Sequence, residues 1–154
     1  MSQSKTIYTS DVSKTEEAGA ALAEQILADP ALPRFVALYG DLGVGKTAFV
    51  RGFASVVAPK SLVRSPTFAL VNEYRSTILP LFHFDMYRID SEDDLISIGY
   101  DDYLMRRGVC LVEWSEKIPY AIPEEFVRVT ITKNDPVHPD SRCITVEFIT
   151  EDKA

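Results

Sequence analysis

The sequence predicts a single α/β domain over residues 1–154, with a mainly parallel central sheet, antiparallel additions and flanking helices. Three observations predict this fold class. The wholly apolar runs 35–39 and 109–112 are typical of strands buried on both faces of a parallel sheet. Segments of helical periodicity lie before and between these runs, and the C-terminal segments alternate in polarity as half-exposed antiparallel strands do.

The first elements expected are an edge strand at 5–9 and a helix. Ser13 and Glu16 have the spacing of a capping box, so we expect the helix to begin beside them. Apolar residues then recur at helical spacing until Pro30 and Pro33 end the helix.

The strand at 35–39 is followed by a glycine-rich turn and a second helix. Apolar residues mark one face of this helix through 49–57, and Pro59 ends it. The extended segments 68–74 and 81–87 are expected to form an antiparallel pair.

Gly99 divides the next region, 90–107, which is expected to form one or two short helices with Ser91 as an N-cap. After the second apolar strand, two strands with period-two alternation are expected at 127–132 and 144–148. These complete the antiparallel additions to the sheet.

The composition restricts the classes of function. Lysine and arginine number 16 against 23 aspartates and glutamates, and the formal net charge of -7 disfavours independent binding to nucleic acid or an anionic membrane. No apolar run reaches the roughly 18–20 residues that span a bilayer, and no secretory signal is evident, so we expect a cytoplasmic protein. The two cysteines form no CxxC pair, which argues against a structural zinc site.

One motif carries chemistry. Residues 40–47 fit the pattern GxxxxGK[ST] of a phosphate-binding loop, here Gly40, Asp41, Leu42, Gly43, Val44, Gly45, Lys46 and Thr47. The glycines allow backbone amides to surround a polyphosphate, and the following helix directs its N-terminal amides at the same charge. Lys46 would reach the β- and γ-phosphates, and the Thr47 hydroxyl would hold Mg²⁺. The motif predicts a P-loop NTPase-like domain.

A nucleoside triphosphatase also needs a carboxylate across the magnesium ion, usually at the end of a buried strand. Glu113 ends the run 109–112, and Asp85 lies at the end of 81–85. Both are candidates because ligands bind at the carboxyl ends of strands in open α/β sheets. The alternative is an acid that only caps the following turn. No Asn-Lys-x-Asp sequence occurs, so ATP is a better candidate than GTP.

Four other residues have open interpretations. Trp114, taken alone, is more typical of packing, and His83 is expected to be packed or hydrogen-bonded rather than a base. Arg64 and Arg88 could offer positive charge to a γ-phosphate, but arginines are usually solvated or paired. The chain therefore shows no convincing arginine finger.

Four blocks, in order, resemble the TsaE family of small bacterial P-loop ATPases, formerly called YjeE, which acts in tRNA threonylcarbamoyladenosine biosynthesis. They are the loop 40–47, Ser-Pro-Thr-Phe at 65–68, His-Phe-Asp-Met-Tyr-Arg at 83–88 and Val-Glu-Trp at 112–114. The resemblance implies a cytoplasmic ATPase that uses ATP and Mg²⁺ and works with the proteins TsaB and TsaD. In that family the complex transfers a threonylcarbamoyl group to the adenosine beside the anticodon. Contact between this chain and tRNA would then be indirect.

The same resemblance implies roles for individual residues. Lys46 and Thr47 would bind phosphate and Mg²⁺, and Glu113 would be a second Mg²⁺ ligand. Asp85 resembles the acid that orients or activates the attacking water. Three further positions match the edge of the family's active site or a switch-like segment: Ser65, Thr67 and Trp114.

The leading hypothesis is a Mg²⁺-dependent ATPase that is slow alone, because it lacks an evident arginine finger, and is stimulated by its partners. One alternative is a nucleotide-gated binding module, whose ATP-bound state controls complex assembly. Another is a small-molecule kinase, although the sequence offers no evident lid or acceptor pocket.

Overall fold

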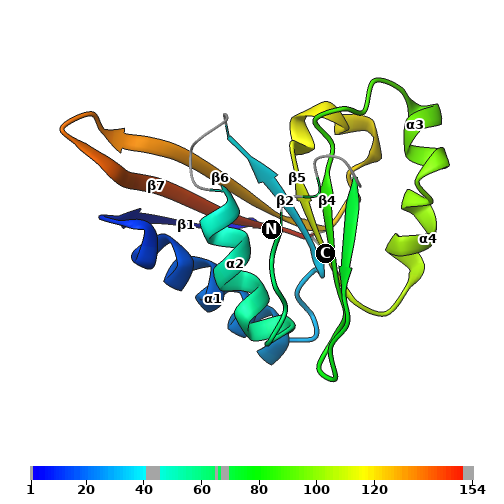
Figure 1. Ribbon diagram of the computed structural model, residues 1–154, viewed down its shortest axis with the longest axis horizontal. Coiled ribbons are helices and arrows are strands. Elements are labelled where there is room, and N and C mark those ends of the chain that lie inside the picture. The colour runs from blue at the N-terminus through cyan, green and yellow to red at the C-terminus, as the bar shows by residue number, and fades with distance from the viewer. Residues whose placement is uncertain (1, 41–45, 65, 67–69, 151–154) are drawn as a thin grey trace.

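The computed structural model describes residues 2–40, 46–64, 66 and 70–150 (Figure 1). In this part of the chain seven strands form one sheet: β1 (Ser2–Thr9), β2 (Phe35–Tyr39), β3 (Val71–Tyr74), β4 (Leu81–Asp85), β5 (Val109–Glu113), β6 (Phe126–Asp135) and β7 (His138–Ile149). The helices are α1 (Val12–Ala28), α2 (Lys46–Val57), α3 (Glu92–Ser97) and α4 (Tyr100–Met105), with short 3₁₀ turns η1 (Ser115–Lys117) and η2 (Pro119–Ala121).

The sheet is parallel at its centre and antiparallel at both ends. Its strand order is β1-β7-β6-β2-β5-β4-β3. The pairs β6–β2, β2–β5 and β5–β4 are parallel, whereas β1–β7, β7–β6 and β4–β3 are antiparallel. The predicted fold class is confirmed, and β1 is the expected edge strand, although it begins at Ser2 rather than at residue 5.

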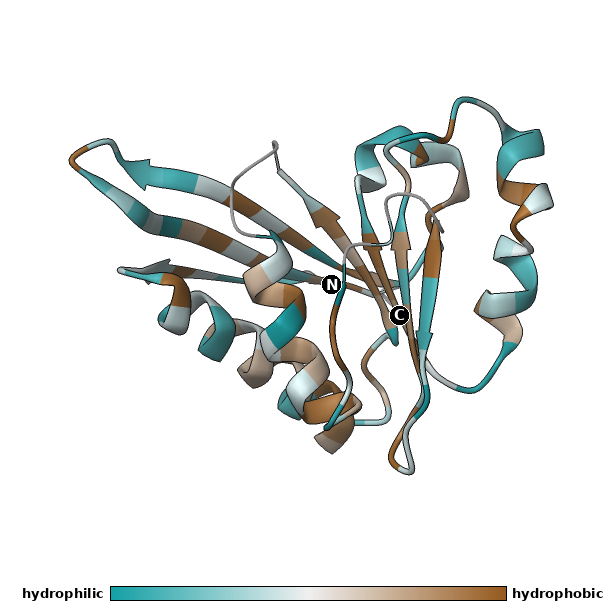
Figure 2. Ribbon diagram, in the orientation of Figure 1, coloured by the Kyte–Doolittle hydropathy of each residue, from teal (hydrophilic) through white to brown (hydrophobic). Residues whose placement is uncertain are grey.

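The two faces of the central strands bury different side chains. Leu38 of β2 and Leu111 of β5 join the core that α1 and α2 cover. On the opposite face, Phe82 and Phe84 of β4 meet the ring of Tyr103 in α4 edge-on, with ring centroids 5.1 and 5.3 Å apart. Figure 2 shows the hydrophobic colouring concentrated in these central strands.

The β6–β7 hairpin differs from the centre in its pattern. Buried and half-exposed residues alternate along much of both strands, as the period-two signal predicts. Figure 2 shows the same alternation of hydrophobic and hydrophilic residues. The strands extend beyond the predicted segments, to Asp135 and from His138, because antiparallel pairing continues through a bulge near Lys133 almost to the turn.

Helices α1 and α2 lie side by side and pack backbone against backbone (Figure 1). A Cβ on Gly19 of α1 would overlap the carbonyl group of Phe49, and a Cβ on Gly52 of α2 would overlap the backbone of Glu16. The two glycines therefore permit the close crossing that holds α2 against the sheet.

The helix starts agree with the sequence in one case and not in another. Ser91 caps α3 in a full capping box with Asp94, as predicted for the N-cap. The capping box predicted at Ser13 and Glu16 is wrong, because α1 begins at Val12 and its N-cap is Asp11, whose side chain accepts from the Lys14 amide. An N-cap needs extended backbone, and Asp11 has it with φ −156° and ψ 176°.

Gly99 separates α3 from α4 with φ 73°, a left-handed conformation that favours glycine. The division of this region into two short helices is confirmed. Within the described ranges, every helix is too short or too polar to cross a lipid bilayer.

Candidate functional site

The predicted phosphate-binding loop connects the first parallel strand to α2. β2 ends at Tyr39, Gly40 follows with φ 141°, and α2 begins at Lys46. Thr47 is the second residue of α2 and is exposed. The predicted residues between Gly40 and Lys46, together with Ser65 and Thr67, lie outside the described residues. The described ends form the strand–helix junction at which a loop of this type binds phosphate.

Lys46 is an unusually buried cation at the start of α2. Only 6% of its surface is exposed. Its Nζ donates a hydrogen bond to the Gly40 carbonyl oxygen at 2.7 Å and lies 3.8 Å from the centroid of the Trp114 ring. A lysine side chain is seldom buried without a role or a partner, because desolvation of its charge is costly. Lys46 is thus held between the start of the loop and the end of β5.

Asp85 and Glu113 lie next to each other at the carboxyl ends of β4 and β5. They are direct partners in the parallel register, and they are 5% and 6% exposed. By strand alternation they point to the same face as Leu111, which is the face that α2 covers. The structure therefore brings together the two predicted carboxylates on the side of the sheet from which Lys46 approaches.

Asp85 is held by the turn that follows β4. Its Oδ1 accepts a hydrogen bond from the Tyr87 amide at 2.9 Å, and the Met86 amide donates to the Glu113 carbonyl oxygen at 3.0 Å. Asp85 therefore does cap a turn, which was the alternative to a functional role. A cap of this kind also fixes the direction of the carboxylate, so the two roles are compatible.

Glu113 is held by a histidine. Its Oε2 lies 2.5 Å from Nε2 of His83, which is 1% exposed. His83 is hydrogen-bonded, as the sequence predicts. The contact with Glu113 was not predictable, because it depends on the register of β4 against β5. The available signal was that His83 and Asp85 are two residues apart on one strand and so share a face.

Trp114 contacts the site and also packs against the core that contains Phe82 and Phe84. It follows Glu113, is half-buried, and adopts a left-handed backbone with φ 58°. Its ring lies over Lys46 and 5.0 Å from the ring of Tyr87. Non-glycine residues in this conformation are uncommon and strained, and they concentrate at functional sites. The packing predicted for Trp114 taken alone is confirmed, and the contact of its ring with the buried Lys46 is additional.

Glu116 is a further residue that the sequence reasoning missed. It lies in η1, and its Oε2 accepts a hydrogen bond from the Gly40 amide at 3.4 Å. No local motif marks Glu116. Its position follows only from the fold, which places η1 beside the end of β2.

The donor set suits a magnesium ion only with help from a ligand. Glu113, Asp85 and the Thr47 hydroxyl offer oxygen atoms, which Mg²⁺ prefers. Within the described residues, no group of three or more histidine, cysteine, aspartate or glutamate side chains is arranged to hold a metal by itself. Mg²⁺ is typically bound by one or two carboxylates together with substrate phosphates and water, and this site fits that mode.

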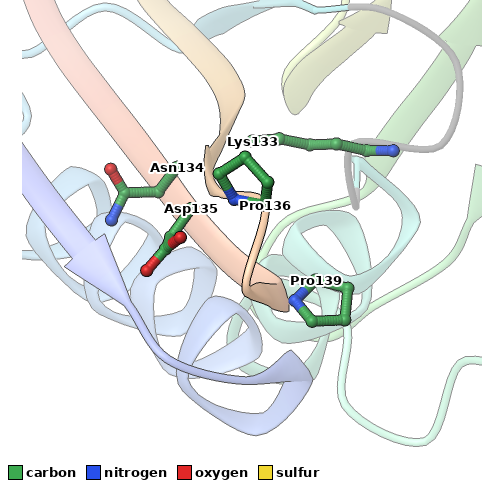
Figure 3. A pocket seen from close by; sticks show the side chains of 5 residues that line it. All are labelled: Lys133, Asn134, Asp135, Pro136 and Pro139. Atoms are coloured by element: carbon green, nitrogen blue, oxygen red, sulfur yellow. The ribbon is translucent and has the colours of Figure 1, made fainter.

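A hollow at the turn of the β6–β7 hairpin is one competing location. It is lined by five residues of the turn, shown in Figure 3: Lys133, Asn134, Asp135, Pro136 and Pro139. These side chains are exposed or half-exposed, and in Figure 3 those of Lys133 and Asn134 point in different directions. The hollow thus lacks the buried, convergent polar groups that usually define a binding site.

Comparison with known proteins gives consistent matches. The family model described as threonylcarbamoyl adenosine biosynthesis protein TsaE matches residues 9–143. A protein of Bacillus subtilis (strain 168) named tRNA threonylcarbamoyladenosine biosynthesis protein TsaE is 43% identical over 96 residues, 62% of this chain and only 60% of that protein. A protein of the same name from Nostoc sp. (strain PCC 7120) is 33% identical over 132 residues, 84% of this chain and 78% of that protein.

One solved structure is similar over almost the whole chain. It is described as the crystal structure of YdiB from Bacillus subtilis, and it matches with a TM-score of 0.77 and 32% sequence identity. The match covers 97% of this chain and 88% of the other.

Proposed function

This chain belongs to the family described as threonylcarbamoyl adenosine biosynthesis protein TsaE, and from that premise we propose that it is a magnesium-dependent ATP hydrolase. In this proposal it supports threonylcarbamoyl transfer to a tRNA adenosine beside the anticodon, together with TsaB and TsaD. One observation carries the catalytic part. A buried lysine at the start of α2 and two buried carboxylates at adjacent strand ends lie on one face of the sheet.

Each side chain has a distinct task in the proposed reaction. Lys46 leaves its contact with Gly40 and binds the β- and γ-phosphates, where the N-terminal amides of α2 favour the same negative charge. Thr47 and Glu113 would hold the metal ion, which would supply positive charge to the phosphate oxygens. Asp85, whose direction is fixed by the Tyr87 amide, orients the attacking water and accepts its proton.

The proposed enzyme is slow by itself. Lys46 is the one buried lysine or arginine among the described residues, and Arg64 and Arg88 are both exposed. A single fixed cation leaves part of the transition-state charge uncompensated, and a second one is worth roughly 10³–10⁵-fold in rate where it has been measured. We therefore expect TsaB and TsaD to supply or order the missing positive charge.

The proposed contact with tRNA is indirect. The net charge of -7 opposes strong binding of an RNA backbone by this chain alone, because such binding depends on neutralising phosphates with lysine and arginine. The chain contributes a nucleotide site, and its partners contribute the RNA surface.

The decisive experiment is an assay of ATP hydrolysis with and without TsaB and TsaD, comparing the wild-type chain with Lys46→Ala. We expect the wild-type chain to turn over ATP slowly by itself and faster with TsaB and TsaD. Lys46→Ala should show no turnover in either condition. Equal turnover in the wild type and Lys46→Ala would identify a contaminating ATPase and overturn the proposal. A fast wild-type rate that the partners leave unchanged would refute the partner-stimulated mechanism.

A nucleotide-gated binding module is the second candidate, and the Lys46–Trp114 contact favours it. Withdrawal of Lys46 by a phosphate would release the Trp114 ring, which contacts the 48% exposed Tyr87. Nucleotide could thus change an exposed surface. Asp85→Ala separates the candidates: lost turnover with retained ATP-dependent binding to TsaB and TsaD favours gating, whereas loss of both favours hydrolysis as the driving step.

A further inference from the structure

His83 lies beside the acid pair, inside the sheet rather than on a loop. In the parallel register of β4 and β5 it is opposite Leu111, two pairs before Asp85 and Glu113. Its ring is buried, and it lies 6.3 Å from the ring of Tyr74 at an interplanar angle of 30°. The strand and its neighbours thus hold this imidazole in place.

The imidazole makes one hydrogen bond within the described residues. Nε2 meets Glu113 Oε2, whereas the buried Nδ1 has no partner there. An ionised carboxylate can only accept, so the Nε2 atom carries a proton and donates it. His83 therefore acts as a fixed hydrogen-bond donor.

This hydrogen bond determines which oxygen of Glu113 remains available. It engages Oε2, and no described residue makes a hydrogen bond to Oε1. A glutamate side chain otherwise has several rotamers, and selecting one of them costs conformational entropy when a ligand binds. Carboxylates that bind metals are commonly oriented in advance by a hydrogen-bonding neighbour.

We propose that His83 is a positioning residue that holds Glu113 with Oε1 ready for a divalent cation. This inference rests on the nucleotide site proposed above and assigns His83 no contact with substrate. The proposed role concerns the cation and not the phosphates, because Lys46 and the start of α2 bind phosphate independently of Glu113.

Calorimetric titration with a non-hydrolysable ATP analogue, in Mg²⁺ and in EDTA, tests the role. The measured quantity is the factor by which Mg²⁺ tightens analogue binding. We expect His83→Leu to reduce this factor by about tenfold or more, within the range typical for outer-shell partners, and to leave binding in EDTA unchanged. His83→Gln, which retains a donor of similar reach, should restore most of it.

His138→Gln is the matched control, because His138 is the other histidine and its side chain is 73% exposed. The His138→Gln variant should bind the ATP analogue as the wild type does, both in Mg²⁺ and in EDTA. A folded His83→Leu variant with the full Mg²⁺ effect would overturn the inference while leaving the nucleotide site intact. If the wild type shows no Mg²⁺-dependent binding, the proposed function and this inference both fail.

A measurement on the wild type covers the case in which His83→Leu does not fold. The ¹⁵N shifts of the histidine rings report which nitrogen carries the proton, and His138→Gln assigns the two rings. We expect His83 to carry its proton on Nε2, before and after addition of Mg²⁺ and the analogue. A proton on Nδ1 alone would contradict the donor role.

Discussion

The carboxyl edge of the parallel strands and the β6–β7 hairpin both offer polar side chains, but they treat them differently. At the carboxyl edge, Lys46, Asp85 and Glu113 are almost fully buried. At the turn of the hairpin, Lys133 and Asp135 are exposed or half-exposed around a hollow that has no convergent partners. The edge therefore carries the desolvation cost of three charges, whereas the hairpin carries almost none.

This difference shows that buried charged side chains, rather than a concave surface, identify the candidate site. A concave surface costs little to form at a hairpin turn, because water continues to solvate its polar groups. Buried charges lower the stability of the fold unless they are paired, so their concentration at one edge supports the site proposed above. The strained backbone of Trp114 at the same edge points the same way.

The largest expected effect contrasts two matched carboxylates. Asp85→Asn should lower the turnover of ATP by roughly 10²–10⁴-fold, because the amide cannot accept a proton from the attacking water. Asp135→Asn in the hairpin should leave turnover unchanged. Steady-state phosphate release measures both. Equal effects of the two substitutions would remove the distinction between the two regions.

A second contrast concerns the helix that carries Lys46. Gly52→Ala should lower the free energy of unfolding by about 1–3 kcal/mol or more, because the new methyl group would overlap the backbone of α1. At Gly99 a Cβ would meet open space, but φ is positive. Gly99→Ala should therefore lower the free energy of unfolding by about 1–2 kcal/mol through backbone strain alone. Urea denaturation compares them. If Gly52→Ala leaves the free energy of unfolding unchanged, α1 and α2 can move apart at their crossing without loss of stability.

The two cysteines sharpen the comparison between centre and hairpin. Burial in β5 raises the pKa of the Cys110 thiol to about 12, so almost none of it is the reactive thiolate near neutral pH. Cys143 in β7 is only half-buried. We expect a thiol reagent at pH 8 to modify Cys143 first and Cys110 only after unfolding. Peptide mapping after brief labelling checks the order. Early labelling of Cys110 would indicate that reagent reaches the central strands of the folded protein.

The smallest effect is expected from a charged pair at the opposite edge of the sheet. Arg106 donates two hydrogen bonds to Glu73 of β3, and these lower the pKa of Glu73. A lowered carboxyl pKa in the folded state adds stability above the unfolded value, near 4.5, that is lost as the pH falls through the folded value. Glu73→Gln should therefore slightly lower the stability of the folded protein at pH 7 and leave its stability unchanged at acidic pH. Thermal unfolding at both pH values, with added salt as a further control, measures this, since salt weakens exposed pairs.

Much of the fold was predictable because its signals are local. The apolar runs of β2 and β5, the Ser91 cap and the break at Gly99 each depend on a few neighbouring residues. The start of α1 was mispredicted because Asp11 and Ser13 can both cap a helix, and only the backbone conformation of the folded chain selects Asp11.

The candidate site was predictable only in part, for a related reason. Lys46, Asp85 and Glu113 could be named from strand ends and a loop motif. The contact between His83 and Glu113 depends on the pairing of β4 with β5, which joins residues about thirty positions apart, and the contact between Lys46 and Trp114 depends on the pairing of β2 with β5. Strand register of this kind is set by the whole hydrophobic pattern and is not marked by any short segment.

The central claim is that nucleotide phosphates bind at the carboxyl edge of the parallel strands, beside Lys46, Asp85 and Glu113. Trp114 is the sole tryptophan of the chain, and its ring lies over the Lys46 ammonium group, so its fluorescence reports on this edge directly. We predict a saturable change in emission when the Mg²⁺ complex of a non-hydrolysable ATP analogue is added to the wild type, and no change with Lys46→Ala. A saturable change of equal size and affinity in Lys46→Ala, or calorimetric binding to the wild type that leaves the emission unchanged, would contradict the claim.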